Sequence, residues 1–262
     1  MDSVEDTIVA TVARLAETPG MDGLLLVGST ATGTRRPNSD IDIVVLIADD
    51  ADWPKPFRDG GREVFFDSAS RQIEVSYTTI RRACEVMRAE ALAGRPWRAE
   101  SFAHSRAVGT CGERSLALVA EARTILDAGP PTIDDGERRW LCFEAWNHRK
   151  DAEDHQDDPA TANLLANAAF DTMTRLLFWM ENRWQPHPKG LLPALADSGP
   201  EFHALADAFL TSGDPAARLP TLRRMEDHFK ARFGLEFEAP YTSPPLRQDE
   251  GADARARATL TP

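Results

Sequence analysis

The sequence predicts an α/β (α+β) fold, in which a small mixed sheet with helices is followed by an all-helical C-terminal domain. Apolar and β-branched runs typical of strands occur only before residue 79, whereas later segments are rich in Ala, Leu, Arg and Glu with helical spacing. The length of 262 residues exceeds that of a typical single domain, so two compact units are expected. We place these units at residues 1–95 and 96–240, and we expect the polar tail at 241–262 to be disordered.

The first predicted element is a helix over residues 3–17. Its start, Ser3-x-x-Asp6, resembles a capping box, and Pro19-Gly20 ends it. Its apolar residues recur with helical spacing: Val4, Ile8, Val12 and Leu15.

Four short strands are predicted next. The continuous apolar run at 24–27 is typical of a strand buried on both faces, and the segment 40–46 is rich in β-branched residues. A loop at 49–61 leads to a third strand at 63–66 and a fourth at 72–78.

Only helices are predicted beyond residue 79, and the last is closed by Gly234. Their expected ranges are 80–93, 113–127, 134–155, 160–184, 201–210 and 220–233.

The composition excludes several classes of protein. Hydrophobic residues make up 42% and charged residues 27% of the chain, as in globular proteins rather than fibrous ones. The net charge of −12 opposes binding to long nucleic acids or anionic membranes. The three cysteines form no CxxC pair, so neither a disulfide framework nor a zinc site is indicated. We expect a cytoplasmic protein, because no apolar run approaches the roughly 20 residues of a membrane span and the N-terminus is acidic.

Two aspartates at the start of the second strand form the centre of the candidate site. Because side chains alternate along a strand, Asp40 and Asp42 project from one face while Ile41 and Ile43 point into the core. Adjacent ionised carboxylates disfavour each other's charge unless a cation neutralises them. Mg²⁺ prefers such oxygen ligands and completes its shell with phosphate oxygens, so a phosphoryl-transfer site is indicated.

Two further elements complete this candidate site. Gly28 allows close backbone approach, and the amides and hydroxyls of Ser29 and Thr30 could donate to phosphates. A nucleotidyl transfer also needs a proton acceptor, for which Glu74 on the fourth strand is the candidate if that strand neighbours the second. Glu63 and Asp67 are rivals for this role.

The combination of these elements resembles the signature of the polymerase-beta-type nucleotidyltransferase superfamily. The motifs that carry the resemblance are the Gly28-Ser29 turn, the following loop, the strand Ser39-Asp40-Ile41-Asp42-Ile43 and the later strand with Glu74. The resemblance implies a nucleotidyltransferase fold, with Asp40, Asp42 and Glu74 as ligands of Mg²⁺, two ions in all, or with Glu74 as the base. It also implies ATP or another NTP as co-substrate.

A small catalytic domain followed by a helical one is similar to aminoglycoside adenylyltransferases and related bacterial small-molecule nucleotidyltransferases. In these enzymes a lysine after a long helix contacts the nucleotide phosphates, which implies this role for Lys189. The resemblance implies transfer of AMP to a hydroxyl of a small polar acceptor, with antibiotic modification as one setting.

Several alternatives stay open. The acceptor could be a protein side chain or a tRNA end, or the chain could be an inactive nucleotide-binding or antitoxin-like protein. Lys189 also fits a helix cap, and Glu74 a solvated strand position. The acidic stretch at 134–158, with Glu144 and Asp151 on one side of a helix, fits either a surface for amines or an ordinary solvated helix. The oligomeric state is not indicated.

Overall fold

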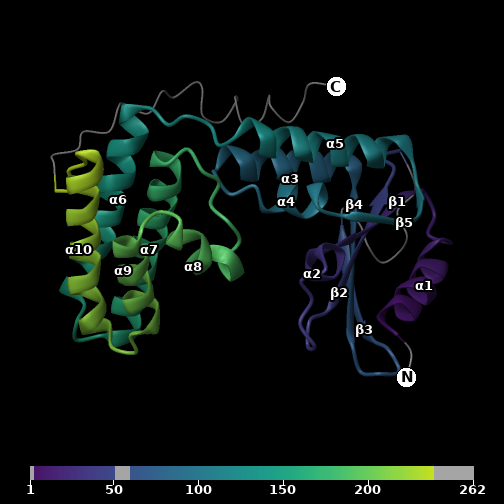
Figure 1. The fold of residues 1–262 in the computed structure, drawn as a ribbon, viewed down its shortest axis with the longest axis horizontal. Coiled ribbons are helices and arrows are strands. Elements are labelled where there is room, and N and C mark those ends of the chain that lie inside the picture. The colour runs from purple at the N-terminus through teal and green to yellow at the C-terminus, as the bar shows by residue number, and fades with distance from the viewer. Residues whose placement is uncertain (1–2, 51–59, 239–262) are drawn as a thin grey trace. The chain divides into compact units, whose positions relative to one another are not determined.

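A computed structural model describes residues 3–50 and 60–238, and it divides the chain into two compact units after Ala128 (Figure 1). We predicted the division after residue 95, but the segment that follows packs into the first unit. The predicted loop at 49–61 lies for the most part outside the described residues, as does the tail at 241–262.

The first unit contains a sheet and the helices that cover it. Its elements are α1 (Val4–Leu15), β1 (Met21–Val27), α2 (Gly28–Thr32), β2 (Ile41–Ile47), β3 (Gly61–Phe66), β4 (Gln72–Thr79), α3 (Ile80–Leu92), α4 (Trp97–Ala103), β5 (Arg106–Cys111) and α5 (Glu113–Ala128). The four predicted strands and the helix at the N-terminus are confirmed. Ser3 and Asp6 form the capping box of α1, as expected.

The sheet is mixed, as predicted, with the strand order β3-β4-β2-β1-β5. β2 and β4 run parallel, with Ile41 opposite Ile73 and Asp42 opposite Glu74, whereas the other neighbours are antiparallel. The strand that carries Glu74 therefore lies beside the strand that carries Asp42.

Each face of the sheet packs against different helices (Figure 1). On one face, Ile8 and Leu15 of α1 pack in a core that includes Ile43 and Val75. On the other face, helices α3, α4 and α5 pack on a second core that includes Val44. Because side chains alternate, Asp42 lies on the same face as Val44, but at the beginning of the strand, where its side chain stays partly exposed.

The strand β5 corrects the prediction that only helices follow residue 79. It pairs with β1 at the edge of the sheet, and among its residues only Val108 is buried. A strand with one buried position has no apolar alternation, so its sequence carries little strand signal. β5, together with α4 and α5, extends the first unit to Ala128.

The second unit is helical, as predicted. It consists of α6 (Asp135–Asp154), α7 (Pro159–Met180), α8 (Pro188–Ala196), α9 (Pro200–Thr211) and α10 (Pro215–Phe233), of which α8 was not predicted. Its core includes the stacked rings of Phe170 and Phe209. Gly234 ends α10 in the left-handed conformation, at φ +68°. Among the helices in the described part of the chain, none has the length and apolar character needed to cross a membrane.

A buried ion-pair network joins α6 to α10. Arg149 is only 2% exposed, and it donates to Glu226 at 2.6 Å and to Glu153 at 2.5 Å. Burial raises the pKa of the Glu226 carboxyl, and the hydrogen bond from Arg149 opposes this rise. Glu153 also accepts from Arg223 at 2.9 Å, so Glu226 is the carboxylate that depends on Arg149 for its neutralisation.

We predict that Arg149→Ala lowers the free energy of unfolding by about 3–5 kcal/mol, because it leaves the buried Glu226 carboxylate without its cation. Urea unfolding followed by circular dichroism measures this loss. Lys150→Ala is the matched control, since Lys150 pairs with Asp154 at the exposed surface of the same helix. The control should lose no more than about 1 kcal/mol. Equal losses in the two variants would contradict the prediction.

Candidate metal centre

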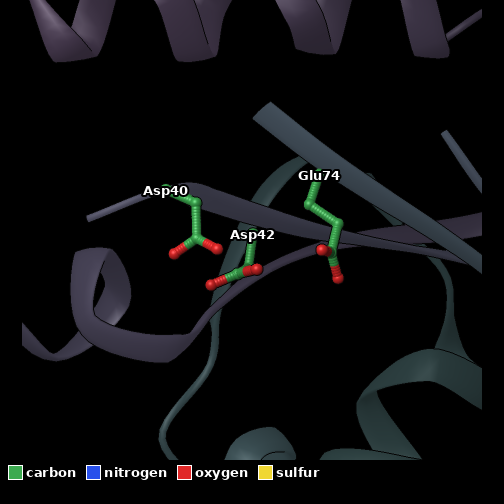
Figure 2. Close-up of side chains that lie close together, drawn as sticks. All are labelled: Asp40, Asp42 and Glu74. Carbon is green, nitrogen blue, oxygen red and sulfur yellow. The ribbon is translucent and has the colours of Figure 1, made fainter. Parts of the chain in front are cut away.

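Three carboxylates come together at the beginnings of β2 and β4. Asp40 directly precedes β2, Asp42 is its second residue, and Glu74 is the third residue of β4. One oxygen from each carboxylate lies within 4.8 Å of the others, and all three residues are partly buried (Figure 2). Since Mg²⁺ binds oxygen at about 2.1 Å, opposite ligands of one ion lie about 4.2 Å apart. A small side-chain adjustment would therefore bring all three onto one ion.

The opposite face of the strands holds these acids in place. Ile41, Ile43, Ile73 and Val75 are no more than 1% exposed. Since side chains alternate, these anchors direct Asp42 and Glu74 to the other face. The parallel register then sets Asp42 and Glu74 side by side. The arrangement predicted from the sequence is confirmed for the positions of the acids, and their chemical roles stay a prediction.

The turn after β1 is built against the Asp42 carboxylate. Gly28 has φ +66°, and a Cβ atom at this position would lie 2.7 Å from Oδ2 of Asp42. The backbone conformation therefore favours glycine, and a larger residue would displace the Asp42 carboxylate. Thr30 donates from its hydroxyl to the backbone oxygen of Asp40 at 3.3 Å, which ties the turn to the acids. Ser29 and Thr30, the predicted phosphate contacts, are partly buried in this turn.

Two arginines near the acids were not included among the predicted site residues. Arg35 donates to the backbone oxygen of Ser39 at 2.7 Å and so closes the loop that ends at Asp40. Arg62 on β3 forms an ion pair with Glu74, with 3.2 Å between Nε and Oε1. The second contact depends on the pairing of β3 with β4, which the sequence pattern alone does not specify.

The rival acids lie away from the three carboxylates. Glu63 is opposite Val75 in the β3–β4 register, on the face covered by α1, and it accepts hydrogen bonds from Tyr77 and Arg14. Asp67 pairs with Arg71 at 2.6 Å. The structure therefore favours Glu74 over both rivals.

The protonation of Asp67 agrees with this conclusion. Burial raises the pKa of its carboxyl, but hydrogen bonds from the Arg71 backbone, from Thr7 and from the Arg71 side chain outweigh burial and lower the pKa to about 2. A general base works best with a pKa near the operating pH, so Asp67 is poorly suited to accept a proton. Thr7 and Asp67 also line a cavity of about 450 Å³ beside α1, with Ile73 of the α1-covered face in its wall.

The candidate residues of the second unit have local partners. Lys189 is exposed in the first turn of α8, where its backbone N–H donates to the His187 ring at 3.3 Å. Glu144 accepts a hydrogen bond from Arg175 at 3.1 Å, and Asp151 accepts one from Asn147 at 3.1 Å. The contact of Lys189 with nucleotide phosphates stays a prediction.

Comparisons with known proteins bear on this geometry. Residues 13–90 match the family model of the nucleotidyltransferase domain, and this range includes all three acids and the Gly28 turn. A solved structure to which the chain is similar is that of a nucleotidyltransferase-like protein from Exiguobacterium sibiricum 255-15. The two share 11% sequence identity at a TM-score of 0.49, over 98% of this chain and 87% of that chain. No curated protein matches the chain.

Alanine at Gly28 tests the link between the turn and the acids. Gly28→Ala adds a Cβ atom against the Asp42 carboxylate, so we predict at least a tenfold loss of affinity for Mn²⁺, roughly 1.4 kcal/mol. Isothermal titration calorimetry measures this affinity without need of a substrate.

Gly33→Ala is the matched control for this experiment. Gly33 has φ +74°, but nothing lies within 4 Å of an added Cβ atom. Both variants should lose about 1–2 kcal/mol of stability through left-handed backbone strain. Only Gly28→Ala should weaken the binding of Mn²⁺, and an equal weakening in both would show that strain alone disturbs the site.

Proposed function

We propose that the protein transfers a nucleoside monophosphate from an NTP, ATP first, to a hydroxyl of a small-molecule acceptor. The match of residues 13–90 to the family model of the nucleotidyltransferase domain supports this proposal. Pyrophosphate is the second product, and the reaction is Mg²⁺-dependent and cytoplasmic. The observation that carries the proposal is the convergence of Asp40, Asp42 and Glu74 beside the Gly28 turn.

Each residue of the site has a role in this reaction. Asp40 and Asp42 would hold Mg²⁺, which when bound polarises phosphate oxygens and neutralises charge that develops on them. Ser29 and Thr30 donate hydrogen bonds to the triphosphate from the turn. Glu74 accepts the proton of the acceptor hydroxyl as its oxygen attacks the α-phosphorus. The bond from that phosphorus to the bridging oxygen breaks, and the pyrophosphate departs with the bonding pair.

Lys189 is the proposed contribution of the second unit. Its ammonium would bind the phosphates as a point charge, so Lys189→Ala should raise the KM for NTP more than it lowers kcat. A larger effect on kcat than on the KM for NTP would contradict the assignment of Lys189 to the phosphate site.

The acidic residues provide the main test of the proposal. We predict that Asp42→Asn and Glu74→Gln each lower kcat for pyrophosphate release by about 100-fold or more, because each removes an ionised oxygen ligand or the proton acceptor. Thermal unfolding shows whether the fold is retained. Glu63→Gln is the matched control, since Glu63 lies on the other face of the sheet and should leave kcat within about threefold of the wild type. Undiminished turnover in Asp42→Asn would refute the site.

A pyrophosphate-release screen of four NTPs against hydroxylated compounds, aminoglycosides among them, tests the class of acceptor. Labelled ATP incubated with lysate and separated by size distinguishes a protein or tRNA acceptor from a small molecule. Tight binding of NTP with Mg²⁺ but no pyrophosphate under any condition would favour the inactive nucleotide-binding alternative.

A further inference from the structure

The strand order indicates from which side of the sheet the acceptor approaches in the proposed reaction. The Gly28 turn follows β1, the aspartates lie at the beginning of neighbouring β2, and Glu74 belongs to β4 on the far side of β2. Edge strand β3 comes next in the same row. In phosphoryl transfer the attacking and leaving oxygens are roughly in line, on opposite sides of the phosphorus. If the turn holds the leaving phosphates, the acceptor approaches Glu74 from the side of β3.

Edge strand β3 presents apolar side chains at this position. Val64 is opposite Glu74 and Phe66 is opposite Gln72, so both side chains lie on the same face as the acids. Val64 is 50% exposed and Phe66 is 63% exposed. Single exposed apolar residues are common on protein surfaces, but these two are adjacent on one face and directly beside the proposed base. They form a surface on which a flat or apolar ring could pack.

One basic side chain lies on this side of the site. Arg62 precedes Val64 on the same face, and its guanidinium pairs with Glu74 at 3.2 Å. An acceptor that carries an ammonium group near its reacting hydroxyl would meet this guanidinium as a like charge, which disfavours binding. Once bound Mg²⁺ has neutralised the three carboxylates, an uncharged or anionic acceptor meets no such repulsion.

We propose that the outward surface of β3, formed by Arg62, Val64 and Phe66, binds the acceptor, and that the acceptor is a hydroxylated compound with an apolar ring face and no positive charge near the hydroxyl. This inference rests on the proposed function and names the substrate class of the same site. An acceptor of this class differs from the aminoglycosides, which carry several positive charges.

Three small phenols that differ in charge test the charge preference. They are 4-hydroxyphenylacetate, which is anionic, 2-(4-hydroxyphenyl)ethanol, which is neutral, and tyramine, which is cationic. With ATP and Mg²⁺, pyrophosphate release should show a kcat/KM for the first two at least about tenfold above that for tyramine and for an aminoglycoside. Arg62→Gln should reduce this ratio, whatever it does to the absolute rate.

Two alanine variants test the apolar surface. Val64→Ala and Phe66→Ala should each raise the KM for the neutral phenol by about tenfold and leave the KM for ATP unchanged. Val9→Ala on α1 is the control, because Val9 is 62% exposed and lies outside the site. It should change neither constant.

The outcomes separate this inference from the proposed function. A preference for aminoglycosides over the phenols, no turnover of any phenol, or an unchanged KM in both β3 variants would overturn the inference while the function stands. Pyrophosphate release in the wild type that Asp42→Asn does not diminish would instead overturn the proposed function.

Discussion

The parallel pairing of β2 with β4 is the contact on which the site depends, because it sets Asp42 beside Glu74. At 4.8 Å, two ionised carboxylates repel by about 1 kcal/mol in water and by about 3–4 kcal/mol at an effective dielectric constant of 20. The four buried anchors behind them contribute about 1.5–3 kcal/mol each. Together the anchors contribute about 6–12 kcal/mol, more than the repulsion between two carboxylates. The core therefore keeps the strands paired while the acids retain a preference for a cation.

The Gly28 turn connects this acidic cluster to the proposed phosphate contacts. Oδ2 of Asp42 occupies the space that a side chain at position 28 would fill, and Thr30 bonds to the backbone of Asp40. A shift of the turn would therefore move against an aspartate, and a shift of β2 would move the amides of the turn. Because the turn and β2 constrain each other, the proposed phosphate contacts and the proposed cation ligands keep a constant separation.

Local periodicity explains which parts of the molecule were predictable. The alternation around Asp40, Asp42 and Glu74 specifies the face of the sheet on which each side chain lies. The three acids could therefore be predicted to cluster on the single further condition that their two strands are neighbours. β5 was missed because Val108 is its one buried residue, and the first unit therefore extends beyond the predicted boundary. The Arg62–Glu74 pair was missed because it depends on the register of an edge strand, and pairing partners are not encoded in a local pattern.

Local charge and net charge lead to different expectations for the acceptor. The net charge of −12 favours a cationic ligand in the surrounding solution, where the field of the whole molecule acts. On the β3 side of the acids, the Arg62 guanidinium lies 3.2 Å from the Glu74 carboxylate, well inside the screening length of about 8 Å at physiological salt. Contacts within this length are screened least. Once a bound cation has neutralised the three carboxylates, the Arg62 charge acts on the acceptor more strongly than the distant surface acids do. Selectivity at the proposed acceptor surface therefore follows from the edge strand rather than from the overall composition.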